Sequence, residues 1–316
     1  MIEQQATAMA PTKQSLRALS KTIYPDAKGI KKIRYRGRFC LWGMTKPDIV
    51  NQTVETFSSP ILSAILKDNK HFHEKPLKPY LNLNIKPEQR ATLINQHFRL
   101  LEATFGENLE KFYTEEGYEL LSFNDRNENS YRLVLKYHNS QSREGDLMVM
   151  LLDSQQRVVY TLAFTIGGER ERTLYIGALQ GASANIEDRP ALIRTLTRSL
   201  HGLRTKSLVV EITLMIAKLL DCQRVVAVSN KGHIYQALRY MGSKRNRVNF
   251  DHDELWSEFG GKVLNKFEYQ LDIEPQRKDP STLKKTKRRL YEKRYKWLAE
   301  TQEAVKNAID AIRWQQ

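Results

Sequence analysis

The 316-residue sequence has two cysteines, Cys40 and Cys222, and no apolar run of the roughly 18–20 residues needed to span a bilayer. Two cysteines cannot build the disulfide framework of a small secreted scaffold. Residues 1–27 lack the apolar stretch of a secretory signal. With 15 glycines, 10 prolines and 41% hydrophobic residues, the chain is neither collagen-like nor largely disordered. We therefore expect a cytoplasmic protein with a buried core.

The familiar catalytic motifs are also missing. The sequence has no GxGxxG or GxxxxGK[ST] loop, no GxSxG elbow, no HExxH helix and no paired CxxC. These absences remove the simplest dinucleotide, nucleotide, hydrolase and zinc-site interpretations. His71-x-His73 with Glu74 contains metal-ligating residue types but no evident third ligand. The segment 251–254 resembles a general-base or metal cluster. We expect both to be solvated loops and predict no metal site.

Positive charge is the property that the chain has in excess. Fifty-one Lys and Arg residues against 36 Asp and Glu give a formal net charge of +15. Nine of the basic residues lie between Lys13 and Arg38, and eight lie in 283–298, each with one acid. This predicts an anionic partner, either inner-membrane lipid or glycolipid, or RNA, because Coulombic attraction does not distinguish them. The alternative is two solvated basic faces. In the second segment we assign anion binding to Lys284, Lys285, Lys287, Arg288 and Arg289.

Hydrophobic periodicity divides the chain into four regions. We expect a basic arm at 1–45 with one short helix, a helical region at 46–116, an α+β core at 117–275 and a basic amphipathic helix at 276–316. Within the helical region, Pro60 is expected to interrupt a helix at 48–68, and another helix is expected from Pro87 to about Phe105. The core combines short strands with helices, so the predicted fold class is α+β, a mixed but mostly antiparallel central sheet with packed helices.

Short runs rich in β-branched and aromatic residues, separated by polar turns, predict the strands of the core. They lie at 120–123, 131–137, 147–152, 158–164, 173–179 and 224–229. Between the last two, helices are predicted at 190–200 and 207–220. The second is apolar nearly all round and is expected to be buried on the sheet. Asn230 is expected to cap a further helix that runs to Met241.

The strongest local candidate for a ligand site is the loop at 201–207. A helix N-terminus presents unpaired backbone N–H groups and partial positive charge, and this loop adds two cationic side chains. It therefore predicts a phosphate or pyrophosphate site. The residues of this loop assigned to the cofactor site are His201, Gly202, Arg204, Thr205, Lys206 and Ser207. The alternative is structural, with Gly202 making a turn and Ser207 capping the helix.

Four ionisable side chains are candidates for proton transfer. His233 and Tyr235 follow the buried strand 224–229, and loops after strands commonly carry function. Glu144 and Asp146 precede the strand at 147–152. If the protein is a transferase, Glu144 or Asp146 is the base toward the acceptor and His233 or Tyr235 is the general acid. The alternatives are packing or capping for His233 and hairpin-turn chemistry for the acidic pair.

Several segments resemble the VirK/YbjX family of Gram-negative bacteria. They are 174–181, 201–206, 226–235, 256–261 and the basic stretch 287–295, and the likeness extends in consistent order from about residue 60 to 310. The resemblance implies a role in virulence, in the cell envelope and in tolerance of antimicrobial peptides. It implies no settled biochemical activity.

The order of elements also resembles, more weakly, the GNAT acyltransferase fold. In that fold a meander of strands leads to a loop that binds acyl-CoA pyrophosphate at a helix N-terminus. The resemblance implies an acyl or aminoacyl transferase that uses acyl-CoA or aminoacyl-tRNA and modifies an envelope glycolipid such as lipopolysaccharide, or its precursor. It places the pyrophosphate loop at 204–207 and implies that Asn230, after the strand at 224–229, also belongs to the cofactor site. The competing prediction is a non-enzymatic protein that binds anionic lipid or RNA and acts at the inner membrane as a peripheral protein.

Overall fold

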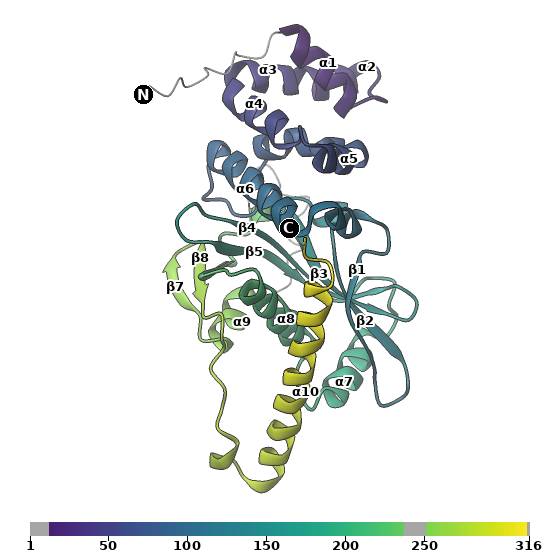
Figure 1. Cartoon of the computed structure of the whole chain (residues 1–316), viewed down its shortest axis with the longest axis vertical. Helices are drawn as coiled ribbons and strands as arrows, with labels where there is room; N and C mark the ends of the chain where they lie inside the picture. Colours follow the sequence, from purple (N-terminus) through teal and green to yellow (C-terminus); the bar gives the residue numbers. More distant parts are fainter. Residues whose placement is uncertain (1–12, 237–250, 315–316) are drawn as a thin grey trace.

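An eight-stranded sheet forms the centre of the molecule, with a stack of helices at one end and a long helix running along it (Figure 1). The structure is a computed structural model that describes residues 13–236 and 251–314. The strands are hydrogen-bonded in the order β1-β2-β3-β4-β5-β6-β8-β7. The predicted α+β class, with a mostly antiparallel sheet, is confirmed.

The N-terminal region is helical throughout its described part. It contains α1 (Lys13–Ile23), α2 (Gly29–Lys32), the π-helical turn η1 (Ile33–Gly37), α3 (Arg38–Thr45), α4 (Pro47–Thr56) and α5 (Pro60–Asp68). The expected short helix is α1, and Pro60 starts a new helix as expected. The basic arm contains further helices beyond this one, and Leu16, Ile23 and Phe39 form a small core of their own. The basic segments on either side of these residues are therefore part of a folded and packed unit.

A buried 3-10 helix, η2 (Lys70–Leu77), takes the place of the expected solvated loop. Phe72 is the physical reason, because its ring packs 5.6 Å from Phe57 and 5.4 Å from Phe98, measured between centroids. Its polar neighbours His73, Glu74 and Lys75 are drawn into the interior with it. The predicted helix that follows is confirmed as α6 (Pro87–Phe105), which continues into the 3-10 helix η3 (Gly106–Tyr113).

The predicted antiparallel meander is confirmed. It consists of β1 (Tyr118–Asn124), β2 (Ser130–Lys136), β3 (Leu147–Asp153), β4 (Val158–Gly167) and β5 (Thr173–Gln180), with the 3-10 turn η4 (Asn139–Gln141) between β2 and β3. β6 (Arg224–Val228) then pairs with β5 in parallel. The hairpin of β7 (Lys262–Asn265) and β8 (Glu268–Leu271) completes the sheet on the far side of β6. β7 was not predicted, because its four residues are all exposed and show no alternation.

Two helices connect β5 to β6: α7 (Arg189–Ser199) and α8 (Thr205–Leu219). α8 is buried on nearly every side and contacts β3, β4 and α10, as its all-round apolar sequence predicts. The helix begins at Thr205 with Arg204 in the N-cap position, so Ser207 lies inside the first turn. The expectation that Ser207 caps α8 is therefore wrong.

The helix expected after Asn230 is not observed in the described residues. Only the 3-10 turn η5 (Ile234–Gln236) follows, and the rest of that expectation lies at 237–250, outside the described residues. α9 (His252–Glu258) begins beyond the gap, with Asp251 accepting a hydrogen bond from the Glu254 N–H at 3.0 Å.

The long C-terminal helix is α10 (Lys285–Asp310), preceded by the 3-10 turn η8 (Pro280–Thr282). Its second half buries Leu298, Val305 and Ile309 against the core, as the apolar spacing predicts. Its basic first half extends below the sheet in Figure 1. In the described part of the chain, we find no helix that combines the length and the apolar character required to cross a bilayer.

Candidate functional site

The parallel strands β5 and β6 separate at their carboxyl ends. Their pairing runs from Thr173 and Arg224 to Ile176 and Ala227. β5 then continues to Gln180 and stays paired with β4, whereas β6 ends at Val228. α8 returns from this end of the sheet, because its C-terminus leads directly into the start of β6. The carboxyl ends of parallel strands are where open α/β sheets place ligands, so this opening is the candidate site.

His252 of α9 reaches into the opening. Its Nε2 accepts a hydrogen bond from the Leu179 N–H at 3.3 Å, and the residue is 1% exposed. A ring nitrogen that accepts a backbone hydrogen bond carries no proton, so the neutral ring is protonated on Nδ1. The expectation that 251–254 is a solvated loop is wrong, because Asp251 caps α9 and His252 is buried beside β5.

Asn230 anchors the beginning of α9 and does not face a cofactor. Its N–H donates to Asp253 Oδ1 at 2.8 Å, and its side-chain amide donates to Asp251 Oδ1 at 2.8 Å. Its side-chain oxygen accepts from the His252 N–H at 2.8 Å. With these three bonds, the residue fixes α9 beside the end of β6. This corrects the assignment of Asn230 to the cofactor site.

Glu144 and His233 meet next to the opening. Glu144 Oε1 lies 3.9 Å from His233 Nε2, and the two side chains are 5% and 4% exposed. His233 Nδ1 accepts a hydrogen bond from the Tyr235 N–H at 3.3 Å, which leaves the ring proton on Nε2, facing the carboxylate. Burial lowers the pKa of His233 to about 4, so the ring is neutral near pH 7. The His233 and His252 ring centroids are 5.5 Å apart.

Tyr235 forms the outer edge of this group of side chains. Its ring centroid is 5.3 Å from that of His233, and the residue is half-buried. Burial and the charge of Glu144 raise the pKa of Tyr235 to about 12, although Arg143 acts in the opposite direction. The phenol therefore keeps its proton at neutral pH. The structure thus brings together a carboxylate, a neutral imidazole and a protonated phenol.

Glycines set the position of the Glu144 segment. A Cβ at Gly177 of β5 would collide with the Glu144 carbonyl oxygen. A Cβ at Gly145 would lie 2.5 Å from the backbone nitrogen of Phe164. The backbone at 144–146 therefore lies directly on β4 and β5, which only glycine permits at these two contacts.

Asp146 has a structural role that differs from that of Glu144. It forms an ion pair with Lys75 and accepts hydrogen bonds from the hydroxyls of Tyr80 and Thr165. Burial alone would raise the pKa of Asp146, but the charge of Lys75, with the hydrogen bonds from Lys75 and Tyr80, holds it below its usual value. Because its oxygens are already bonded in the interior, the arrangement favours Glu144 as the base.

The loop at 201–207 lies at the same end of the sheet. One part of the loop contacts α9 and the other part contacts α10. Arg204 forms an ion pair with Glu258 of α9, and Lys206 Nζ is 3.9 Å from the same carboxylate. Both His201 and Gly202 lie against α10, where the Arg294 Nε donates to the His201 oxygen at 3.1 Å. The start of α8 therefore remains a candidate anion site, whereas His201 and Gly202 face away from it.

The remaining positions predicted in that loop are buried. Thr205 is 1% exposed and Ser207 is 8% exposed, so only their backbone N–H groups contribute to the first turn of α8.

The five basic residues assigned to anion binding lie at the start of α10. Arg288 Nη2 donates to the Ser281 oxygen at 2.7 Å and closes the preceding turn, and the side chains of this stretch are exposed.

The buried Lys75 was missed by sequence reasoning. Its partner Asp146 is 71 residues away in the chain, so no local pattern joins them.

The metal interpretation of the His71 segment gains no support, because the described residues contain no cluster of three His, Cys, Asp or Glu side chains suited to a metal ion.

Comparison with known proteins places the chain among uncharacterized relatives. Escherichia coli K12 has an uncharacterized protein, YbjX, that is 28% identical over 267 residues, covering 84% of this chain and 80% of that protein. A Haemophilus influenzae uncharacterized protein is 25% identical over 222 residues, covering 70% and 72%. No solved structure matches the chain. A family model described as a protein of unknown function, DUF535, matches residues 28–307. The chain therefore belongs to the DUF535 family.

Proposed function

We propose that this protein is a transferase that moves an acyl or aminoacyl group to an amine or hydroxyl of an envelope glycolipid, such as lipopolysaccharide or its precursor. The observation that carries the proposal is the opening between β5 and β6, with Glu144 and His233 3.9 Å apart beside it. An antiparallel meander, an opened parallel pair and a helix that starts at the opening also resemble the GNAT fold. The envelope acceptor is supported only by the likeness to the VirK/YbjX family and its association with virulence.

The proposed donor is acyl-CoA or aminoacyl-tRNA, both of which carry phosphate groups. The first-turn N–H groups of α8, with Arg204 and Lys206, would hold that phosphate. The acceptor nitrogen or oxygen attacks the donor carbonyl carbon and forms the new bond. Glu144 takes the proton that the acceptor loses. The bond to sulfur, or to the ribose oxygen of aminoacyl-tRNA, breaks, and Tyr235 gives its proton to that leaving atom.

The first prediction is that one variant loses donor binding, whereas another keeps donor binding and loses acyl transfer. Acetyl-CoA, a long-chain acyl-CoA or aminoacyl-tRNA should raise the melting temperature of the purified protein, and Arg204→Ala/Lys206→Ala should abolish the shift. Glu144→Gln should keep the donor shift but lower acyl transfer to extracted lipopolysaccharide by 100-fold or more, followed by mass spectrometry, since general base catalysis contributes about 10²–10⁴-fold.

The matched control is Lys218→Ala, which removes one cation from the opposite end of α8, where it pairs with Glu274. This variant should behave as the unmodified protein in both assays. If none of the donors alters the melting temperature, or if Glu144→Gln transfers the acyl group at the normal rate, the transferase proposal fails.

A second candidate is a non-enzymatic role at an anionic membrane surface. The N-terminal helices expose Ile30 (84%) and Ile33 (75%) next to Lys31 and Lys32. Apolar side chains among basic ones are typical of segments that lie in a membrane interface. Salt-sensitive binding to anionic vesicles in the same screen, without any donor shift, would favour this candidate. The same non-enzymatic role with RNA as the partner would use the basic start of α10.

A further inference from the structure

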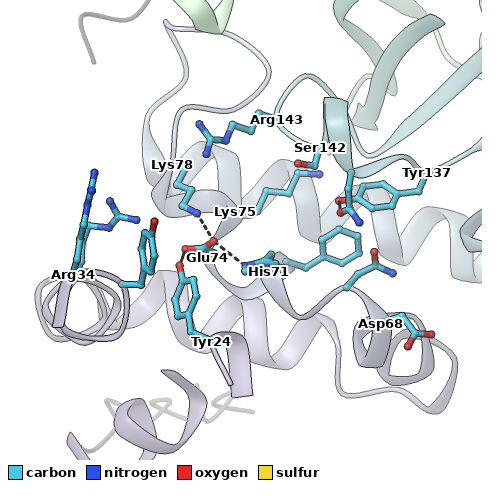
Figure 2. A pocket seen from close by; sticks show the side chains of 15 residues that line it. Tyr24, Arg34, Asp68, His71, Glu74, Lys75, Lys78, Tyr137, Ser142 and Arg143 are labelled. Atoms are coloured by element: carbon cyan, nitrogen blue, oxygen red, sulfur yellow. Dashed lines mark hydrogen bonds and ion pairs between the residues drawn. The ribbon is translucent and has the colours of Figure 1, made fainter. Parts of the chain in front are cut away.

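A basic cavity separate from the opening between β5 and β6 lies between the N-terminal helices and the core (Figure 2). Its volume is about 610 Å³, within the roughly 300–1,000 Å³ typical of small-molecule sites. Five Lys or Arg side chains and two carboxylates line it. The cations are Arg34, Arg38, Lys75, Lys78 and Arg143. They come from the N-terminal helices, from η2 and from the segment before β3, so positive charge faces the cavity from several walls.

One of the two carboxylates is already bonded. Glu74 accepts the Tyr24 hydroxyl and the Lys78 ammonium, and its Oε1 is 3.1 Å from His71 Nδ1 (Figure 2). It is almost fully buried, so it acts as a fixed part of the wall. Lys75 at the base of the cavity is likewise paired with Asp146 beneath it. These contacts hold the cavity in shape.

Arg34 and Arg38 have aromatic partners but no acidic ones. Within the described residues, neither forms an ion pair, and the Nε of Arg38 is buried without a hydrogen-bond partner. The guanidinium of Arg38 lies 4.7 Å from the Trp42 ring centroid and 5.8 Å from that of Tyr35. Stacking of this kind orients the planar fork of an arginine and leaves its N–H groups for an anion.

The cations also lie close enough to repel one another. Burial lowers the pKa of Lys78, and the charges of Arg143 and Arg38 lower it further, against the opposing effect of Glu74. Burial and the charge of Arg34 likewise lower the pKa of Arg38. Like charges gathered around a cavity favour a bound anion, because it relieves their repulsion.

We propose that this basic cavity binds a phosphate monoester or diphosphate group, with Arg34, Arg38 and Arg143 around it. A phosphate monoester carries a charge of about −1.5 to −2 and three acceptor oxygens, which suits cations that converge from different walls. A carboxylate carries one charge and two oxygens and is satisfied by a single arginine. The phosphate could belong to a soluble metabolite or to a lipid headgroup, and the two sources are separable by experiment.

The test is calorimetric titration of the full chain with inorganic pyrophosphate and inorganic phosphate. Arg34→Gln/Arg38→Gln should weaken pyrophosphate binding at least tenfold. Lys31→Gln/Lys32→Gln is the matched control, because it removes two cations from the same helical region that do not line the cavity. The control should bind within twofold of the unmodified chain. Near-ultraviolet circular dichroism checks the fold, and Arg34→Gln alone, at an exposed position, should still weaken binding several-fold.

Two further titrations identify the source and the chemistry. Glucose 6-phosphate represents a soluble phosphomonoester, and phosphatidic acid vesicles represent a lipid one, with phosphatidylglycerol vesicles as the phosphodiester control. Arginine-dependent binding to either phosphomonoester supports the proposal. It is overturned if pyrophosphate and phosphate do not bind, if both double variants weaken binding equally, or if citrate binds as tightly as pyrophosphate. These titrations do not depend on the acyl-transfer assay, so the cavity and the proposed transfer reaction are tested independently.

Discussion

At the scale of single residues, the pair of Lys75 and Asp146 is the most deeply buried ionic contact described, with side-chain exposures of 5% and 0%. Removing charges from water is costly, and the cost is offset only when further bonds satisfy both groups. Lys75 also donates to the Gly145 oxygen at 3.0 Å and lies 5.0 Å from the Tyr80 ring centroid. The pair therefore ties η2 to the segment that carries Glu144.

The second prediction concerns this pair. Lys75→Met should lower the free energy of unfolding by about 3–5 kcal/mol, because it leaves the Asp146 carboxylate buried without its cation. Lys46→Met is the control, since it removes one partner of an exposed ion pair with Glu88 and should cost less than about 1 kcal/mol. Urea denaturation measures both. Equal effects of the two substitutions would contradict the structural role assigned to Asp146.

At the scale of elements, the sequence predicted what depends on local pattern and missed what depends on distant partners. Both α6 and α8 were predictable, because their signals come from residues adjacent in sequence. These signals are the caps and periodicity of α6 and the apolar surface of α8. The buried helix η2 was missed because its burial follows from Phe72 packing against distant rings. No local pattern predicts the opening beyond Ile176, because strand separation is a property of two chain segments and not of one.

The third prediction tests the close contact between β5 and the Glu144 segment. Gly177→Ala places a methyl group where the Glu144 carbonyl oxygen lies, and it should cost about 1–3 kcal/mol of stability through overpacking. Gly181→Ala is the control in the same part of the chain, since its nearest neighbour would be the Tyr160 hydroxyl at an ordinary 3.6 Å. Thermal and urea denaturation of the two variants should differ clearly. Similar stabilities would mean that β5 and residues 144–146 are not in the close contact described.

At the scale of the whole molecule, one hydrophobic cluster joins Phe57 of the N-terminal part to Ile312 near the end of the chain. This continuity explains why the candidate site was only partly predictable. Glu144 and His233 were each singled out from local sequence, but the core brings them together across several intervening elements. Glu144 and His233 could therefore be predicted as candidates from the sequence. The distance between them and the separate burial of Asp146 are known only from the folded structure.

The same core contains histidines that burial keeps neutral. Burial lowers the pKa values of His73, His97 and His233 to about 4. In the unfolded chain a histidine titrates near pH 6.5, so between these two values the unfolded state binds more protons than the folded state. The stabilising contribution is complete above pH 6.5 and is lost as the pH falls toward 4.

The fourth prediction is therefore a steep loss of stability in mild acid. Each fully coupled histidine contributes a slope of about 1.4 kcal/mol per pH unit, so the three together approach roughly 4 kcal/mol per unit between pH 6 and 4.5. His97→Gln should lower that slope by about a third, because its amide oxygen can still accept the Ile166 N–H that now reaches His97 Nδ1 at 3.1 Å. His138→Gln, at an exposed position, should change it less. Urea denaturation at a series of pH values measures the slope, and a flat profile from pH 6.5 to 4.5 would show that these rings accept protons in the folded core.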